Sequence, residues 1–385
     1  PIEGLQLNKE QLIELDARLL QEARAIARPD ERSLALARVA RSKILDGDFP
    51  AAETALVEAG RAALAVPPGL IRDLRLMTVV RRNAEDRGGF VGLAEALSTQ
   101  GRAEDNIRDP DAPLSPEFLE TWTRALRAAQ MAWDQAADLA VQIGRRPYRA
   151  EALYQVVESQ AIDLTQRGAL LDASEAQGEE LREEAAPARL REAAALIDAG
   201  LRRSAEHARR IDLVQWRDRA LAAVVSGAAG SRRFELGLEI ARSIPQPEAR
   251  ADALLRLAEA EARHGSPAGT TRAYTEALRS IASIPVADLR AILTGVMVDS
   301  LISSGRYDDA RAATVLYPDS PRRRAALGAV AEAMGRRGLT DSANAWIARE
   351  NPPELRAELH RRLNDGILTS LEQFRTRELS INPVP

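Results

Sequence analysis

The sequence contains no cysteine in its 385 residues. This absence excludes disulfide bonds and metal sites built from thiolates. Histidine is almost as scarce, because His207, His264 and His360 are its only occurrences and lie far apart. No acidic residue stands beside them in a recognised metal motif. The sequence therefore predicts no metal site and no bound cofactor.

Long hydrophobic runs are also missing, since no apolar stretch approaches the ~18 residues that a membrane-spanning helix needs. We therefore expect a soluble chain. The sequence begins at Pro1 rather than at methionine, which indicates that an upstream segment has been removed. The compartment stays open for that reason, with the cytoplasm favoured and the periplasm or the exterior as alternatives.

The short motifs of common enzyme families do not occur: there is no G-x-G-x-x-G, no P-loop and no G-x-S-x-G. Carboxylates are abundant, but on helical repeats such abundance indicates a solvated face. We therefore predict a protein without catalytic activity and name no catalytic residue. An enzyme or a small-molecule sensor on a helical scaffold is an alternative, which a deep pocket with converging polar groups would favour.

Lysine is nearly absent, since Lys9 and Lys43 are its only occurrences, and the basic charge is therefore arginine. The formal net charge of -4 provides no overall field that would attract nucleic acid. Arginine pairs recur along the chain, and many lie near expected helix ends, where a guanidinium complements exposed carbonyl groups. We interpret these arginines as structural. A helical-repeat protein that binds RNA is the alternative interpretation.

Alanine, leucine, arginine and glutamate dominate the composition, whereas aromatic residues make up only 4%. The abundant residues lose little conformational freedom in a helix, so an all-α protein is expected. Residues 250–349 repeat one pattern three times: two helical runs are joined at a glycine and followed by a proline. The glycines are Gly265, Gly305 and Gly338, and the prolines are Pro285, Pro318 and Pro352. The glycines lie 40 and 33 residues apart, which indicates a structural repeat.

The turns carry a resemblance to the tetratricopeptide repeat family. The pattern Gly-x-aromatic-x-x-Ala occurs at residues 305–310 (GRYDDA) and 47–52 (GDFPAA), with weaker copies at Gly338, Gly265, Gly200 and Gly89. The small residues that fall on close-packing positions of the family are Ala40, Ala59, Ala258, Ala277 and Ala331. The aromatic positions of the family's first helix depart from the pattern, being filled by Leu254, Glu261, Leu327 and Met334. The resemblance implies a divergent member or a neighbouring type of helical repeat.

This resemblance implies an α-solenoid, a right-handed superhelix of antiparallel helix pairs. We expect N-terminal repeats over residues 1–100, a linker or long loop at 101–114 and a second array over 115–376. An acidic stretch near 170–189 is expected to be an irregular insertion in that array, and residues 377–385 an extended tail. The expected role is a protein-interaction module or scaffold whose partner is a protein or peptide. The oligomeric state is not indicated.

The repeat register also suggests a binding surface. If the first helix of each pair lines a concave groove, one set of mostly acidic positions faces it. These candidates are Glu151, Tyr154, Glu158, Asp252, Leu255, Glu259, Asp299 and Glu332. We expect this stripe to recognise a basic or amphipathic peptide segment of a partner protein. The alternative interpretation is an ordinary solvated helix face.

Overall fold

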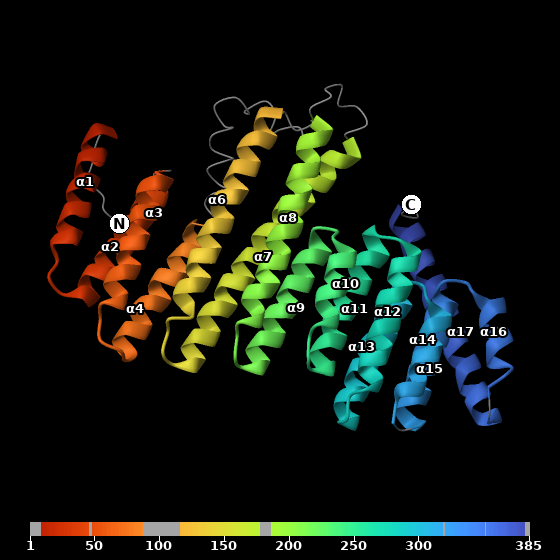
Figure 1. Ribbon diagram of the computed structural model, residues 1–385. Helices are drawn as coiled ribbons and strands as arrows, with labels where there is room; N and C mark the ends of the chain where they lie inside the picture. The colour runs from red at the N-terminus through yellow and green to blue at the C-terminus, as the bar shows by residue number, and fades with distance from the viewer. Residues whose placement is uncertain are drawn as a thin grey trace. The chain divides into compact units, whose positions relative to one another are not determined.

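The computed structural model describes the chain as a series of α-helices (Figure 1). The described residues are 9–45, 48–87, 116–177, 186–318, 320–350 and 352–381. Within these ranges no β-strand occurs, and no helix is long and apolar enough to cross a membrane. The chain divides into two compact units, Pro1–Ile244 and Pro245–Pro385, which we call the first unit and the second unit.

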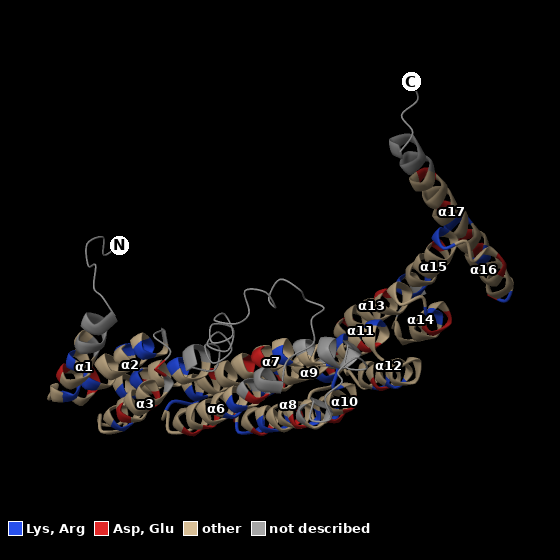
Figure 2. Ribbon diagram, turned by 90° about the horizontal axis from the view of Figure 1, so that it is seen from above, with Lys and Arg blue, Asp and Glu red and all other residues tan. Residues whose placement is uncertain are grey.

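The helices of the first unit stand in two rows, which Figure 2 shows from above. Row A holds α2 (Pro29–Leu45), α4 (Leu70–Arg81), α7 (Arg146–Gln177) and α9 (Val214–Gly230), and each of them contacts the next. Row B holds α1 (Lys9–Ala25), α3 (Phe49–Leu64), α6 (Pro116–Ala140), α8 (Ala186–Arg209) and α10 (Phe234–Arg242). A π-helical turn, η1 (Arg82–Arg87), extends α4. Contacts between the rows pair α2 with α3, α4 with α6, α7 with α8 and α9 with α10.

The second unit repeats this arrangement. Its row A holds α11 (Pro247–His264), α13 (Ala287–Ser303), α15 (Ser320–Arg336) and α17 (Pro353–Ile381), again in contact from one to the next. Its row B holds α12 (Pro267–Ala282), α14 (Tyr307–Ala313) with the 3-10 turn η3 (Thr314–Leu316), and α16 (Thr340–Ile347). Stacked helix pairs of this kind make an all-α solenoid, which confirms the expected fold class. The right hand of the superhelix stays a prediction.

The helices of a pair are joined by one type of tight turn at four places in the described chain. In each turn an amide donates a hydrogen bond to the carbonyl five residues earlier, as in a Schellman motif. The bonds run from Asp48 to Lys43 (2.9 Å), Arg233 to Ala228 (2.7 Å), Arg306 to Leu301 (2.8 Å) and Leu339 to Met334 (3.0 Å). Gly305 and Gly338 precede the donor with φ of 71° and 70°. The turns predicted at these two glycines are therefore confirmed.

The turn between α9 and α10 has arginine where the other turns have glycine. Arg232 takes the left-handed conformation there with φ of 53°. The pattern Gly-x-aromatic-x-x-Ala is therefore absent at this turn, and the sequence alone did not predict the turn as a copy of the motif. The other turns of this type have a small residue four positions after the amide that donates the hydrogen bond. The turn at Arg232 keeps this feature, since the residue four positions after its donor Arg233 is the buried Gly237 of α10.

Small buried residues hold the rows together, as the resemblance implied. The five alanines at the close-packing positions are all fully buried. Gly200 was expected at a turn, but that prediction is wrong, because the residue lies inside α8. A β-carbon there would lie 3.1 Å from Leu164 and 3.2 Å from Gln130, so Gly200 allows two helices to approach. Gly47 and Gly89 lie outside the described residues.

The expected irregular regions differ from the structure in their extent. The linker at 101–114 lies outside the described residues, and the helices before and after it, α4 and α6, contact one another within the first unit. The boundary between units lies after Ile244, where the sequence analysis expected a continuous array. Only 178–185 of the expected insertion is not described, since α7 and α8 take up the rest. The tail is helical as far as Ile381, because the first proline that can stop α17 is Pro383.

Loops between successive pairs share a second motif that the sequence analysis missed. At the start of each loop an amide bonds to the carbonyl three residues earlier, and an arginine stands six residues further on. In three loops the arginine side chain is seen to reach back to that starting residue: Arg149 donates to the carbonyl of Ile143 (3.0 Å), Arg290 to Ile284 (2.7 Å) and Arg356 to Glu350 (3.1 Å). The other pairs at this spacing are Ile26–Arg32, Val66–Arg72, Ile211–Arg217, Ile244–Arg250 and Tyr317–Arg323. These arginines mark the repeat better than glycine does.

Two carboxylates tie neighbouring pairs of the first unit together. Asp73 of α4, which is only 2% exposed, accepts hydrogen bonds from the backbone amides of Gly144 (2.8 Å) and Arg145 (3.1 Å). It thereby anchors the loop before α7 to α4. Asp212, in the loop before α9, accepts from Arg149 (2.7 Å) and from Arg146 (2.9 Å). Arg149 thus binds both its own loop and the next one.

The second unit ends where α17 crosses α15 in backbone contact. A β-carbon on Gly335 would lie 2.2 Å from the carbonyl oxygen of Leu363, and one on Gly366 would lie 2.0 Å from that of Glu332. Neither distance is compatible with any side chain. The two glycines therefore fix the point at which the helices cross.

Replacing Gly305 by valine should destabilise the second unit by about 1–2 kcal/mol, because a left-handed backbone is unfavourable for a β-branched residue. The space around the added side chain is open, so the effect is conformational rather than a clash. Gly305→Asn should lose less, since asparagine visits this conformation more readily. Urea unfolding followed by circular dichroism measures both variants, and an unchanged midpoint for valine would contradict the turn.

Acid should weaken the tie made by Asp212. The hydrogen bond from Arg149 is the main cause that lowers the pKa of Asp212, and burial opposes it. Because the folded pKa lies below that of an unfolded chain, the carboxylate stabilises the fold above pH ~4, and this contribution is lost as pH falls through the folded pKa. The difference in urea midpoint between the wild type and Asp212→Asn should therefore be largest near neutral pH and shrink in acid. Asp341→Asn, at an exposed residue, is the control.

Candidate functional site

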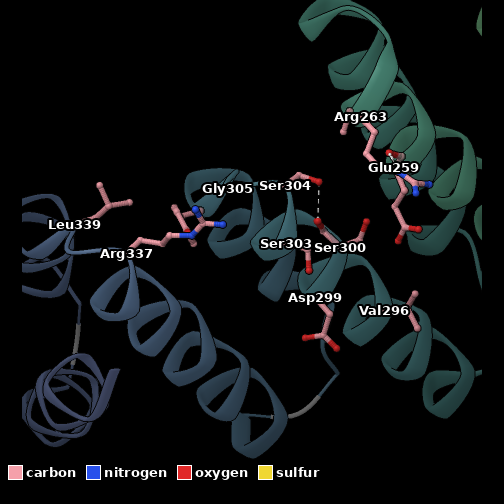
Figure 3. Close-up of a pocket in the computed structure, with 12 residues that line it drawn as sticks. Glu259, Arg263, Val296, Asp299, Ser300, Ser303, Ser304, Gly305, Arg337 and Leu339 are labelled. Atoms are coloured by element: carbon pink, nitrogen blue, oxygen red, sulfur yellow. Dashed lines mark hydrogen bonds between the residues drawn. The ribbon is translucent and has the colours of Figure 1, made fainter. Parts of the chain in front are cut away.

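A groove of about 980 Å³ opens in the second unit between α11, α13, α14 and the turn that joins α15 to α16 (Figure 3). Its lining residues are Glu259, Ala262, Arg263, Val296, Asp299, Ser300, Ser303, Ser304, Gly305, Tyr307, Arg337 and Leu339. Two of the residues expected in a binding groove, Glu259 and Asp299, are among them. They come from neighbouring helices of row A, which is the arrangement that the repeat register predicted for these two.

Helix α13 supplies the apolar part of the groove. Residues at positions 292, 296, 299 and 303 share one face of a helix, because three or four residues make a turn. On that face Ile292 is 62% exposed and Val296 is 43% exposed. Ile292 and Asp299 also line an adjoining hollow of about 460 Å³ against α15. The exposed stripe of α13 therefore runs as an apolar ridge with a carboxylate near its end.

The charged groups of the groove include both signs. Among the described residues, the carboxylates of Glu259 and Asp299 have neither an ion-pair partner nor a hydrogen-bond donor. Arg263 donates to the backbone carbonyl of Glu259 (3.3 Å), and Figure 3 shows the guanidinium of Arg337 directed toward the turn at Gly305. Two anionic and two cationic side chains therefore face the groove, which suits a ligand with polar and apolar parts.

Two of the serine hydroxyl groups of the groove, those of Ser300 and Ser304, are already bonded. Tyr274 of α12 lies within hydrogen-bond distance of the hydroxyls of Ser300 (2.8 Å) and Ser304 (3.1 Å). Ser304 also donates to the backbone carbonyl of Ser300 (2.9 Å), a bond drawn in Figure 3. No histidine or carboxylate bonds to these hydroxyls in the described part of the chain. They stiffen the floor of the groove, and nothing in their contacts would activate a nucleophile.

The candidates in the first unit form a separate cluster on α7 and α9. Tyr154 is 7% exposed and donates a hydrogen bond to Glu158 (2.5 Å). Its ring meets the ring of Trp216 edge-on at 5.4 Å, and the guanidinium of Arg219 lies 4.7 Å from its centre. Burial is the first cause that raises the pKa of Tyr154, the bond to Glu158 adds to it, and Arg219 opposes it. This cluster packs two helices together, and Glu151 lies half-buried beside it.

The remaining candidates are either paired with arginine or buried. Asp252 pairs with Arg256 (3.0 Å), and Glu332 pairs with Arg336 (2.7 Å) and with Arg362 (3.4 Å). Leu255 was expected to face the groove, but it is only 1% exposed and lies in the core. The physical reason is the helical period: Leu255 shares the face of the fully buried Ala251 and Ala258. The expected stripe of eight residues thus leaves two unpartnered carboxylates in one groove.

Sequence reasoning missed the apolar and basic members of the groove. Val296 and Ile292 share the helical face of Asp299, so extending that register along α13 finds them. Arg263 likewise shares the helical face of Glu259 on α11, whereas Arg337 and Leu339 are harder to anticipate because they lie at the turn between α15 and α16. Among the described residues, no group of three or more histidine, aspartate or glutamate side chains could hold a metal ion.

Exchanging the two free carboxylates for amides should leave the fold intact. Because neither group has a partner in the groove, Glu259→Gln with Asp299→Asn should change the free energy of unfolding by no more than about 0.5 kcal/mol. Leu255→Ala, in the same helix but in the core, should destabilise the unit by about 2–5 kcal/mol. Urea unfolding compares the variants, and a large loss in the amide variant would assign a structural role to the carboxylates.

No family model matches the sequence, and no curated protein matches it. Among solved structures the chain is similar to one described as a circular tandem repeat protein with novel repeat topology and enhanced subunit contact surfaces. The two share 14% sequence identity and a TM-score of 0.41, over 97% of this chain and 91% of that chain. At these values the likeness carries no argument about family or function. The helical repeat architecture rests on the helix pairs themselves, and the relation to tetratricopeptide repeats stays a prediction.

Proposed function

We propose that the chain is a non-catalytic protein-interaction module, and that the groove of the second unit binds a peptide segment of a partner protein. Solenoids of helix pairs present extended surfaces that serve protein recognition in general. The observation that carries the proposal is the position of two unpartnered carboxylates, Glu259 and Asp299, beside the exposed apolar ridge of α13. A peptide bound there would cover Val296 and Ile292 with an apolar side chain and place a basic one near the carboxylates.

The same geometry favours an amphipathic ligand over a purely basic one. Arg263 and Arg337 balance the formal charge of Glu259 and Asp299, so a uniformly cationic peptide would meet repulsion as well as attraction. A segment that carries basic and acidic residues on either side of an apolar anchor would complement the charges of both signs. Such an anchor, buried on binding and ringed by polar groups, is the usual centre of an interface.

The alternatives receive less support from this groove. An RNA-binding repeat would need a surplus of positive charge and exposed rings for stacking, whereas the four charges here cancel. An enzyme would need a polar group that another group activates, but the hydroxyls of Ser300 and Ser304 bond only to each other's residues and to Tyr274 among the described residues. A peptide site needs neither feature.

Reversing the two carboxylates should strongly weaken partner capture. We expect Glu259→Lys with Asp299→Lys to lower the recovery of specific partners in a native pulldown by about tenfold, which corresponds to a loss of ~1.4 kcal/mol. The partner segment is then synthesised, and its affinity is measured by fluorescence anisotropy.

The matched control changes the net charge equally at exposed sites outside the groove, with Glu206→Lys and Glu354→Lys. It should retain the partners that the wild type captures. Equal recovery with the groove variant would overturn the assignment of the groove, as would a partner set that the control loses as well.

A further inference from the structure

The first unit has an exposed basic face that the proposed groove does not involve. It lies on α2 and α4, and we call it the arginine face. Its residues are Arg38, Arg41, Ile71, Leu74, Arg75 and Arg81. All of them except the half-buried Arg75 are exposed.

The packing of row A places these residues on one surface. Leu36 and Ala40 of α2 share a core cluster with Ala55 and Ala59 of α3, and Val79 joins it from α4. The opposite sides of α2 and α4 therefore face away from row B. Since α3 returns the chain between them, α2 and α4 run in the same direction, and η1 also contacts α2. Arg41 and Arg81 therefore lie toward the C-terminal ends of their helices, Arg38 and Arg75 lie near the middle, and Ile71 and Leu74 lie in the first half of α4.

No carboxylate among the described residues neutralises the charge on this face. None of its four arginines has an ion-pair partner among the described residues, and the Nε of Arg75 is shielded from solvent without a hydrogen bond. The acidic residues of the two helices are occupied elsewhere. Asp30 and Glu31 pair with Arg28, and Asp73 binds backbone amides. Like charges placed together without acids repel one another, so the arrangement favours an anionic ligand.

Some arginines elsewhere in the first unit differ in this respect. Arg24 pairs with Glu58 at 2.7 Å, and Arg146 pairs with Asp212 at 2.9 Å, in both cases across neighbouring helix pairs. Those side chains hold the array together. The four arginines of the arginine face make no such link, so the stacking of repeats does not explain them.

Apolar side chains beside the arginines define the kind of anion. Ile71 is 55% exposed and Leu74 is 43% exposed, one helical turn apart on α4. Nucleic acid would contact the arginines through its phosphates and stacked bases, which would leave the exposed Ile71 and Leu74 without a role. An acidic protein segment with an apolar stripe matches both features, because helix-binding surfaces use apolar anchors at such spacing.

We infer that the arginine face binds an acidic amphipathic segment of a partner protein. Its apolar side chains lie over Ile71 and Leu74, and its carboxylates contact Arg75 and Arg81 of α4 together with Arg38 and Arg41 of α2. Arginine forms paired hydrogen bonds with carboxylates, so these contacts specify orientation as well as charge.

The test uses the full chain and a fluorescein-labelled peptide of about 15 residues, with leucines at helical spacing and glutamates between them. Anisotropy titrations measure its affinity, and the same peptide with glutamine in place of glutamate reports apolar contact alone. We expect the acidic peptide to bind, the glutamine peptide to bind about tenfold more weakly or not at all, and the affinity to fall with added salt.

Variants of the face locate the site. Arg41→Glu with Arg81→Glu should weaken binding of the acidic peptide at least tenfold, and Leu74→Ser should weaken it several-fold. The matched control, Arg349→Glu with Arg361→Glu, reverses two exposed arginines of the second unit and should bind as the wild type does. The groove variant Glu259→Lys with Asp299→Lys should also bind normally, which separates this proposal from that for the groove. Circular dichroism verifies that each variant is folded.

Three results would overturn the inference: no binding of the acidic peptide to the wild type, equal binding to the Arg41 and Arg81 variant, or equal loss in the second-unit control. A single-stranded RNA of similar length is titrated in parallel. Tighter binding of that RNA, unaffected by Leu74→Ser, would assign the face to nucleic acid instead.

Discussion

The structure depends on how backbone groups at the helix ends find partners. A helix leaves its last carbonyls and first amides without bonds inside the helix, and a solenoid of short helices has many such ends close together. Here the turns within pairs close on the backbone itself, whereas the loops between pairs use side chains. Arg149, Arg290 and Arg356 bind carbonyls, and Asp73 binds the amides of residues 144 and 145. Order at the loops in turn allows alanine-rich faces to pack closely.

This use of arginine separates two populations of the same residue. Arginines of the first population donate hydrogen bonds to backbone carbonyls or form ion pairs with carboxylates of neighbouring helix pairs. They contribute to the stacking of the repeats. The other, which includes the four members of the arginine face, has no such partner among the described residues. A chain whose formal net charge is only -4 can therefore carry a local basic surface in one unit and free carboxylates in the other. The two proposed binding surfaces, one basic and one of mixed charge, would let one chain hold two different partners at once.

The sequence allowed the repeat to be predicted where local chemistry is unambiguous. Gly305 and Gly338 are needed at left-handed positions, and alanines recur where helices approach. The predictions of these turns and of these close-packing positions were therefore correct. The turn predicted at Gly200 was wrong because glycine also occurs inside helices, where it allows close packing. The prediction for Leu255 was wrong because this residue shares the buried helical face of Ala251 and Ala258. Whether a carboxylate is free, as Asp299 is, or paired, as Glu332 is, depends on side chains from other helices, which one-dimensional spacing does not encode.

The crossing of α15 and α17 has a consequence for how the chain tolerates change in length. Each residue advances a helix by about 100°. One residue inserted between Pro353 and Gly366 would rotate the glycine out of the crossing and bring a side chain against the carbonyl of Glu332. An insertion in the loop before Pro353 would leave that phase untouched. In the C-terminal helix the number of residues before Gly366 therefore matters as much as their identity.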